Sequence, residues 1–184
     1  MRVRTLTNLF QQSALSSKLV SRFLLPPLLL LLLAGCATDH QSGLRRNKQI
    51  TQRYFDRWAN HGDTEVADEL ITTNLVLHSP PAVISSLADY KKGMAGFHAA
   101  FPDLHFTIED SVAEGDKVVV RWTLRGTQMT DYQGHPPSRR MMTVTGMSSF
   151  RIANGKIQEI FVNMDRHGMM EQLGWLPPTA PLPK

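Results

Sequence analysis

The feature that most constrains the fold is a change in the period of the hydrophobic pattern near Pro102. Before this residue, apolar side chains recur at helical spacing, and after it apolar and polar residues alternate over four segments. Alternation of this kind predicts strands that bury one face. We therefore expect an α+β domain, with helices first and then an antiparallel meander.

The residues before Pro102 predict three helices. The first is expected at about 45–60, where four apolar residues form one stripe: Ile50, Tyr54, Phe55 and Trp58. Asp63 or Thr64 is expected to cap a second, short helix. The third is expected to begin at Ser85 and to end before Pro102, because proline cannot continue a helix.

Five strands and a last short helix are also expected. The stretch NLVLHSPP predicts a strand that ends at two prolines, because these lack the N–H that a sheet requires. The remaining four are expected at about 104–113, 117–130, 141–153 and 157–165. EGDK and ANGK predict tight hairpin turns, and HGMMEQLG predicts the helix. A strongly curved sheet wrapped over helices encloses a cone that can hold a small apolar molecule.

The N-terminal segment is typical of a secretory signal. Residues 1–35 contain four basic and no acidic residues and end in FLLPPLLLLLLAG, which is short and interrupted for a membrane span. The sequence Leu33-Ala34-Gly35-Cys36 resembles the lipobox of bacterial lipoproteins. This resemblance implies acylation of Cys36, the only cysteine, and each buried CH₂ would contribute ~0.8 kcal/mol to membrane binding. The alternative is an ordinary cleaved signal.

Removal of this segment changes the charge balance. Four of the 20 basic residues lie within it, so that 16 remain against 16 acidic residues. No basic stripe with interleaved aromatic residues indicates a nucleic-acid partner. Without a second cysteine, disulfides are excluded and the core must supply the stability. We expect a tether at 36–44, one domain at 45–176 and a Pro-rich tail at 177–184.

Five motifs, taken in order, resemble a known family. YFDRWANHGD, LVLHSPP, KKGMAGFHAAFPDLHFTIEDSVAEGDKVVVRWTLRGT, VTGMSSFRIANGKIQEI and MDRHGMMEQLG are similar to the SnoaL-like polyketide cyclases, or ester cyclases, of the NTF2-like superfamily. The resemblance covers residues 45–176. It implies a cone-shaped α+β fold, an aldol cyclisation without cofactor or metal, and in many relatives a homodimer formed through the outer sheet face. It also implies a general acid and base near the end of the last strand, at the position of Asp165.

Two interpretations of Asp165 are open from the sequence. A carboxylate serves as acid and base when an apolar site raises its pKa toward neutrality. Phe161 and Asn163 lie on the same strand face as Asp165, so an inward carboxylate would stand above an aromatic floor beside an amide. Alternatively, Asp165 caps the last helix or pairs with Arg166.

Four further residues are candidates for the site. His78 stands at a strand position where the family often carries histidine, which makes it the expected catalytic partner of Asp165 if it reaches into the cone. Tyr54 and Trp58 lie one helical turn apart and offer a ligand an O–H and an N–H, or else belong to the core. Arg121 is either an inward guanidinium that binds a carbonyl or carboxylate, or an outward, solvated one.

Two candidates depart from the family pattern. Gln128 and Met147 stand where histidines are expected, and although both are expected to contact a ligand, neither can transfer a proton. The methionines concentrated after residue 128 suit either an adaptable pocket or an ordinary core. The histidines show no metal-binding spacing, so we expect no metal and no cofactor.

The sequence therefore predicts a lipid-anchored domain that faces the periplasm from the outer membrane. Its ligand is expected to be a small apolar or carbonyl-containing molecule. Three hypotheses remain open: acid and base chemistry by Asp165 and His78, binding without turnover, and a cone filled by its own side chains that serves as an interaction module.

Overall fold

A computed structural model describes residues 41–177 of the protein. The predicted signal segment, Cys36, residues 36–40 of the predicted tether and residues 178–184 of the tail lie outside these residues, whereas the rest of the tether, residues 41–44, is helical. Within the described range, no helix combines the length and the apolar character needed to cross a membrane.

The helices begin and end close to the predicted residues. Residues 41–61 are helical, and a π-helical turn, η1 (Tyr54–Ala59), lies within them. The others are α2 (Thr64–Leu70), α3 (Leu87–Ala100) and α4 (Arg166–Leu173). Asp63 caps α2 as expected, since its side chain accepts a hydrogen bond from the backbone N–H of Val66.

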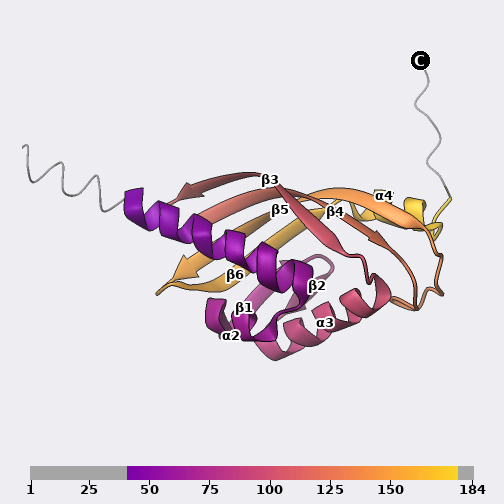
Figure 1. Ribbon diagram of the computed structural model, residues 1–184, viewed down its shortest axis with the longest axis horizontal. Coiled ribbons are helices and arrows are strands. Elements are labelled where there is room, and N and C mark those ends of the chain that lie inside the picture. Colours follow the sequence, from indigo (N-terminus) through magenta and orange to yellow (C-terminus); the bar gives the residue numbers. More distant parts are fainter. Residues whose placement is uncertain (1–40, 178–184) are drawn as a thin grey trace, which may run out of the picture. The chain divides into compact units, whose positions relative to one another are not determined.

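Six strands form one curved sheet, shown in Figure 1. They are β1 (Ile71–Ser79), β2 (Ala82–Ile84), β3 (His105–Glu114), β4 (Lys117–Thr127), β5 (Met141–Ala153) and β6 (Lys156–Met164). The order in the sheet is β2-β1-β6-β5-β4-β3, and the antiparallel meander from β3 to β6 is confirmed. The pattern did not predict β2, nor the parallel pairing of β1 with β6.

One side of the sheet is buried against the helices. Along β4, Val118, Val120, Trp122 and Leu124 are buried, whereas the residues between them are exposed or half-buried. Helix 41–61, α2 and α3 lie on this side (Figure 1), and we call it the helix side. The opposite side of the sheet is called the outer side.

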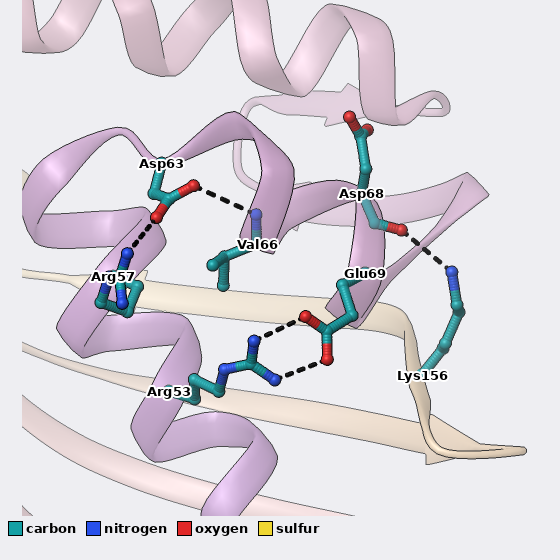
Figure 2. A network of polar contacts seen from close by, with 7 residues as sticks. All are labelled: Arg53, Arg57, Asp63, Val66, Asp68, Glu69 and Lys156. Carbon is teal, nitrogen blue, oxygen red and sulfur yellow. Dashed lines mark hydrogen bonds and ion pairs between the residues drawn. The ribbon is translucent and has the colours of Figure 1, made fainter.

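Polar contacts connect α2 to the first helix and to the start of β6 (Figure 2). Arg53 forms a bidentate ion pair with Glu69, and Arg57 forms an ion pair with Asp63 at 2.6 Å. The Nζ of Lys156 donates to the backbone oxygen of Asp68 at 2.9 Å. These groups are largely exposed, so each contact contributes little to the stability.

The β6 strand contains a register shift that changes which side chains face the helices. Arg151 and Ile152 of β5 are consecutive, but they pair with Glu159 and Ile157 of β6. Gln158 is therefore an extra residue, as in a β-bulge, and the alternation reverses after it. Ile157 and Ile160 are both completely buried for this reason.

A close contact fixes the packing of β4 on β5. Trp122 stands opposite Gly146, and a Cβ at Gly146 would lie 2.3 Å from the indole ring. Only glycine leaves room for the ring at this position. The indole Nε1 then donates to Ser148 Oγ at 2.9 Å on the helix side.

We predict that Gly146→Ala lowers the free energy of unfolding by about 1–3 kcal/mol, because the methyl group displaces the indole. The matched control is Gly96→Ala in α3, where an added Cβ meets no atom within 4 Å. That change should raise the stability by about 0.5–1 kcal/mol through helix propensity. Urea unfolding of both variants tests the contact, and a Gly146→Ala protein as stable as wild type would contradict it.

Candidate functional site

A cavity lies between the helix side of the sheet, the first helix and α3. Its inner part has a volume of about 130 Å³ and its outer part, which reaches the surface, about 400 Å³. The two parts adjoin, since they share five lining residues: Leu77, Ser79, Tyr90, Met94 and Met164. Ligand pockets begin at about 300 Å³, so the hypothesis of a cone filled by its own side chains is not supported.

The inner part is aromatic and carries neutral hydroxyl groups. Tyr54 and Tyr90 form a hydrogen bond between their hydroxyls, and the Ser148 hydroxyl is also buried here. Burial raises the pKa of Tyr54 well above its ordinary value of 10.0 and also raises that of Tyr90. Both phenols therefore stay protonated at neutral pH. The one that accepts in their mutual hydrogen bond keeps its own proton free to donate to a ligand.

The outer part carries one cation. Arg166, the first residue of α4, is half-buried, and its Nη2 donates to Ser79 Oγ at 3.2 Å. Burial raises the pKa of Tyr132, and the nearby Arg166 guanidinium partly opposes this rise. Among the described residues that line either part of the cavity, none is an aspartate, a glutamate or a histidine.

Gln128 is a structural residue, so the prediction that it contacts a ligand is wrong. Its side chain is completely buried and does not line the cavity. The amide makes five hydrogen bonds, to Thr130, His135, Pro136, Ser138 and Trp175. These bonds hold the loop of residues 128–140, which places Tyr132 at the outer part of the cavity.

The prediction that Asp165 faces the cavity is also wrong. Alternation counted from buried Ile157 would turn Phe161, Asn163 and Asp165 inward, but the extra residue Gln158 reverses it. Val162 and Met164 line the cavity instead, while Phe161, Asn163 and Asp165 are exposed. The position predicted for a buried acid therefore lies on the outer side of the sheet.

Asp165 caps α4, which is the alternative that the sequence left open. Its Oδ1 accepts a hydrogen bond from the backbone N–H of Gly168 at 2.8 Å. A Cβ at Gly168 would lie 2.2 Å from Asp165 Oδ2, so the cap requires a glycine at this position. Asp165 thus stabilises the helix that carries Arg166.

Arg121 and Met147 lie with Asn163 and Asp165 around a shallow, open depression of the outer side. Arg121 pairs with Met147 across β4 and β5, and Met147 pairs with Asn163 across β5 and β6. The inward placement predicted for Arg121 and Met147 is wrong because Trp122 and Ser148 occupy the inward positions beside them. Four predicted residues are thus brought together on the outer side, and Met164, which lines the cavity, also lines this depression.

His78 does not reach into the cone, contrary to the prediction, because its neighbour Leu77 takes the inward position on β1. The His78 ring stacks on Phe161, with 4.1 Å between the ring centroids. Its Nε2 lies 3.0 Å from Glu159 Oε1, and Arg151 contacts the other carboxylate oxygen at 3.1 Å. Arg151 and then His78 lower the pKa of Glu159.

Of the predicted site residues, Tyr54 is the one that lines this cavity. Trp58 is buried and lines a neighbouring space of about 300 Å³ together with His98. The Nε1 of Trp58 and the Nε2 of His98 are buried and without a hydrogen-bond partner in the part of the chain that the structure describes. Burial lowers the pKa of His98, which favours its neutral form.

Sequence reasoning missed Ser79, Tyr90, Trp122, Ser148 and Arg166. Three of them, Ser79, Tyr90 and Trp122, could have been recognised from the hydrophobic pattern of their own strand or helix. Trp122 and Leu124 share one phase of β4, and Ser79 shares the phase of Leu77. Tyr90 belongs to the apolar stripe of α3. Arg166 gave no signal, because its placement depends on the turn between β6 and α4.

A curved, mostly antiparallel sheet that encloses a largely apolar cavity against N-terminal helices defines an NTF2-like α+β domain. The family model of the SnoaL-like polyketide cyclases matches residues 48–173, and the chain belongs to this family. No curated protein matches the sequence.

Solved structures agree with this assignment. A candidate SnoaL-like polyketide cyclase from Jannaschia sp. CCS1 is 26% identical, with a TM-score of 0.67 over 72% of this chain and 94% of that one. AclR, a candidate hydroxylase from Streptomyces galilaeus, has the same identity and TM-score over 74% and 86%. IdmH, a candidate polyketide cyclase from Streptomyces antibioticus, is 28% identical, with a TM-score of 0.62 over 70% and 98%. Because these structures are assigned different activities, cyclase and hydroxylase, the fold does not by itself define the reaction.

We predict that Asp165→Ala lowers the free energy of unfolding by about 0.5–2 kcal/mol, because the helix loses its cap. Asp165→Asn should stay close to wild type, since asparagine caps equally well. Chemical unfolding compares the two variants. A loss of ligand binding in a stable Asp165→Asn protein would contradict a purely structural role.

Proposed function

We propose that the domain binds a small, mostly apolar molecule in the cavity on the helix side and does not carry out acid and base chemistry on it. The observation that supports this proposal is the lining of the cavity: aromatic and aliphatic side chains with neutral hydroxyls. Apolar pockets with a few placed polar groups are typical of small-molecule sites.

Cyclase chemistry by Asp165 and His78 is the weaker candidate. General acid and base catalysis requires the group to be within hydrogen-bond reach of the ligand. Both residues contact other groups of the outer side or of α4. The Tyr54 and Tyr90 hydroxyls would polarise a carbonyl oxygen, but with raised pKa values they do not serve as a base at neutral pH.

Octanol serves as a neutral apolar probe of this proposal. We predict that Met164→Trp weakens octanol binding at least tenfold, because the larger ring fills both parts of the cavity. Met147→Trp is the matched control, since Met147 lies at the same end of the sheet but on its outer side, and its affinity should stay within about twofold of wild type. Calorimetric titration measures both, and unchanged binding in Met164→Trp would refute the cavity as the site.

The lipid anchor at Cys36 is a second part of the proposal. It is supported by the lipobox-like sequence around the only cysteine and places the domain at the outer membrane, facing the periplasm. We predict that Cys36→Ala moves the protein from the membrane fraction to the soluble fraction of lysed cells. A variant that still sediments with membranes would exclude lipidation as the anchor.

A homodimer through the outer side is a third part. One residue from each strand lies in a continuous cross-strand row: Val83, His78, Phe161, Ser149, Val119 and Val112. Phe161 and the three valines are at least 40% exposed, and charges of both signs flank the row. Such a row suits a self-complementary interface. Analytical ultracentrifugation measures the mass in solution. A dimeric wild type and a monomeric Phe161→Lys protein would support this interface, and a monomeric wild type would refute it.

A further inference from the structure

The guanidinium of Arg166 is the feature of the cavity that the proposed function leaves without a role. It lines the outer part, is half-buried, and donates one hydrogen bond to Ser79 Oγ. Within residues 41–177 it forms no ion pair, whereas Arg53, Arg57 and Arg151 each contact a carboxylate. The adjacent carboxylate of Asp165 is occupied by the cap of α4.

A half-buried guanidinium needs acceptors. It has five N–H donors, and the Ser79 hydroxyl satisfies one of them. The other described residues that line the outer part include no acidic side chain, so the positive charge is uncompensated by the lining. Loss of water around such a charge is costly unless an anion replaces it.

The position of Arg166 relative to the rest of the cavity indicates the shape of the molecule that would bind there. Ser79, which Arg166 contacts, lines both the inner and the outer part. Beyond it lie Met94, Met164 and then the aromatic inner part. Tyr132 also lines the outer part, and its hydroxyl group offers an additional donor there. An occupant would therefore have one acidic end and an apolar body.

We propose that the ligand is an amphiphilic monocarboxylate, whose carboxylate binds Arg166 and the Tyr132 hydroxyl while its apolar body extends past Met94 and Met164. The proposal rests on the proposed ligand-binding function of the same cavity. Arginine matches a carboxylate with two parallel hydrogen bonds. Among the described lining residues Arg166 is the single cation, and one charge balances a carboxylate but not a phosphate dianion.

The test compares octanoate, which is ionised at neutral pH, with octanol, which has the same chain length but no charge. Wild-type protein should bind octanoate at least tenfold more tightly. Arg166→Gln should abolish this preference while leaving octanol affinity within about twofold. Arg166→Lys keeps the charge but loses the forked geometry, so an intermediate preference is expected.

The control is Arg125→Gln, on the outer side of β4, which should leave the preference unchanged. Melting temperatures establish that the variants are folded.

Each outcome supports or overturns a defined part of the account. If octanol binds and wild type does not prefer octanoate, the carboxylate proposal is overturned but the ligand-binding function stands. If the preference persists in folded Arg166→Gln, the anion binds elsewhere and the proposal is wrong, whatever Arg125→Gln shows. If neither compound binds wild type, the proposed function fails together with this inference.

Discussion

The extra residue Gln158 in β6 is the constraint on which the placement of the site depends. A strand alternates its side chains with a period of two, so one additional residue exchanges the two faces for everything that follows. Upstream of it Ile157 faces the helices, and downstream Val162 and Met164 do so in place of Phe161 and Asn163. The same shift directs Asp165 to the start of α4, where it becomes a cap. The residues that β6 contributes, Val162 and Met164 to the lining and Phe161 to the exposed cross-strand row, result from this one irregularity.

The contact between Trp122 and Gly146 supports this arrangement from the neighbouring strands. The indole is nearly completely buried, packs edge-to-face with Phe106 at 5.3 Å and donates to Ser148. A glycine opposite a large aromatic ring leaves room for the ring and fixes the register of β4 on β5. The inner part of the cavity is therefore built from residues that also define the core.

Most of the fold could be predicted from the sequence, because period and turn chemistry are local properties. The α3 helix and the four meander strands follow from such signals, as does the Asp63 cap. The parallel pairing of β1 with β6 could not be predicted, since the two strands are more than 70 residues apart. The site was misplaced for a related reason. In IFVNM both strand phases contain apolar residues, and the register of β6 on β5, which decides between them, is a non-local property.

The family includes candidate polyketide cyclases, but the groups that line the cavity of this chain favour ligand binding over acid and base chemistry. The SnoaL-like fold is shared with candidate polyketide cyclases, yet in this chain the cavity presents tyrosine and serine hydroxyls with one guanidinium. Such groups hold and orient a ligand, whereas a base at neutral pH is not among them. A cavity of this kind is suited to bind an amphiphilic molecule with one acidic end.

The central claim is that the ligand occupies the helix side of the sheet, and the methionine methyl groups test it directly. Met94 and Met164 line the cavity, whereas Met141 and Met147 are exposed on the outer side. In NMR spectra of methyl-labelled protein titrated with octanoate, the account predicts shifts of the Met94 and Met164 signals while those of Met141 and Met147 stay in place. A shift of Met147, with or without Met164, while Met94 stays in place would contradict it, because Met164 also lines the outer depression.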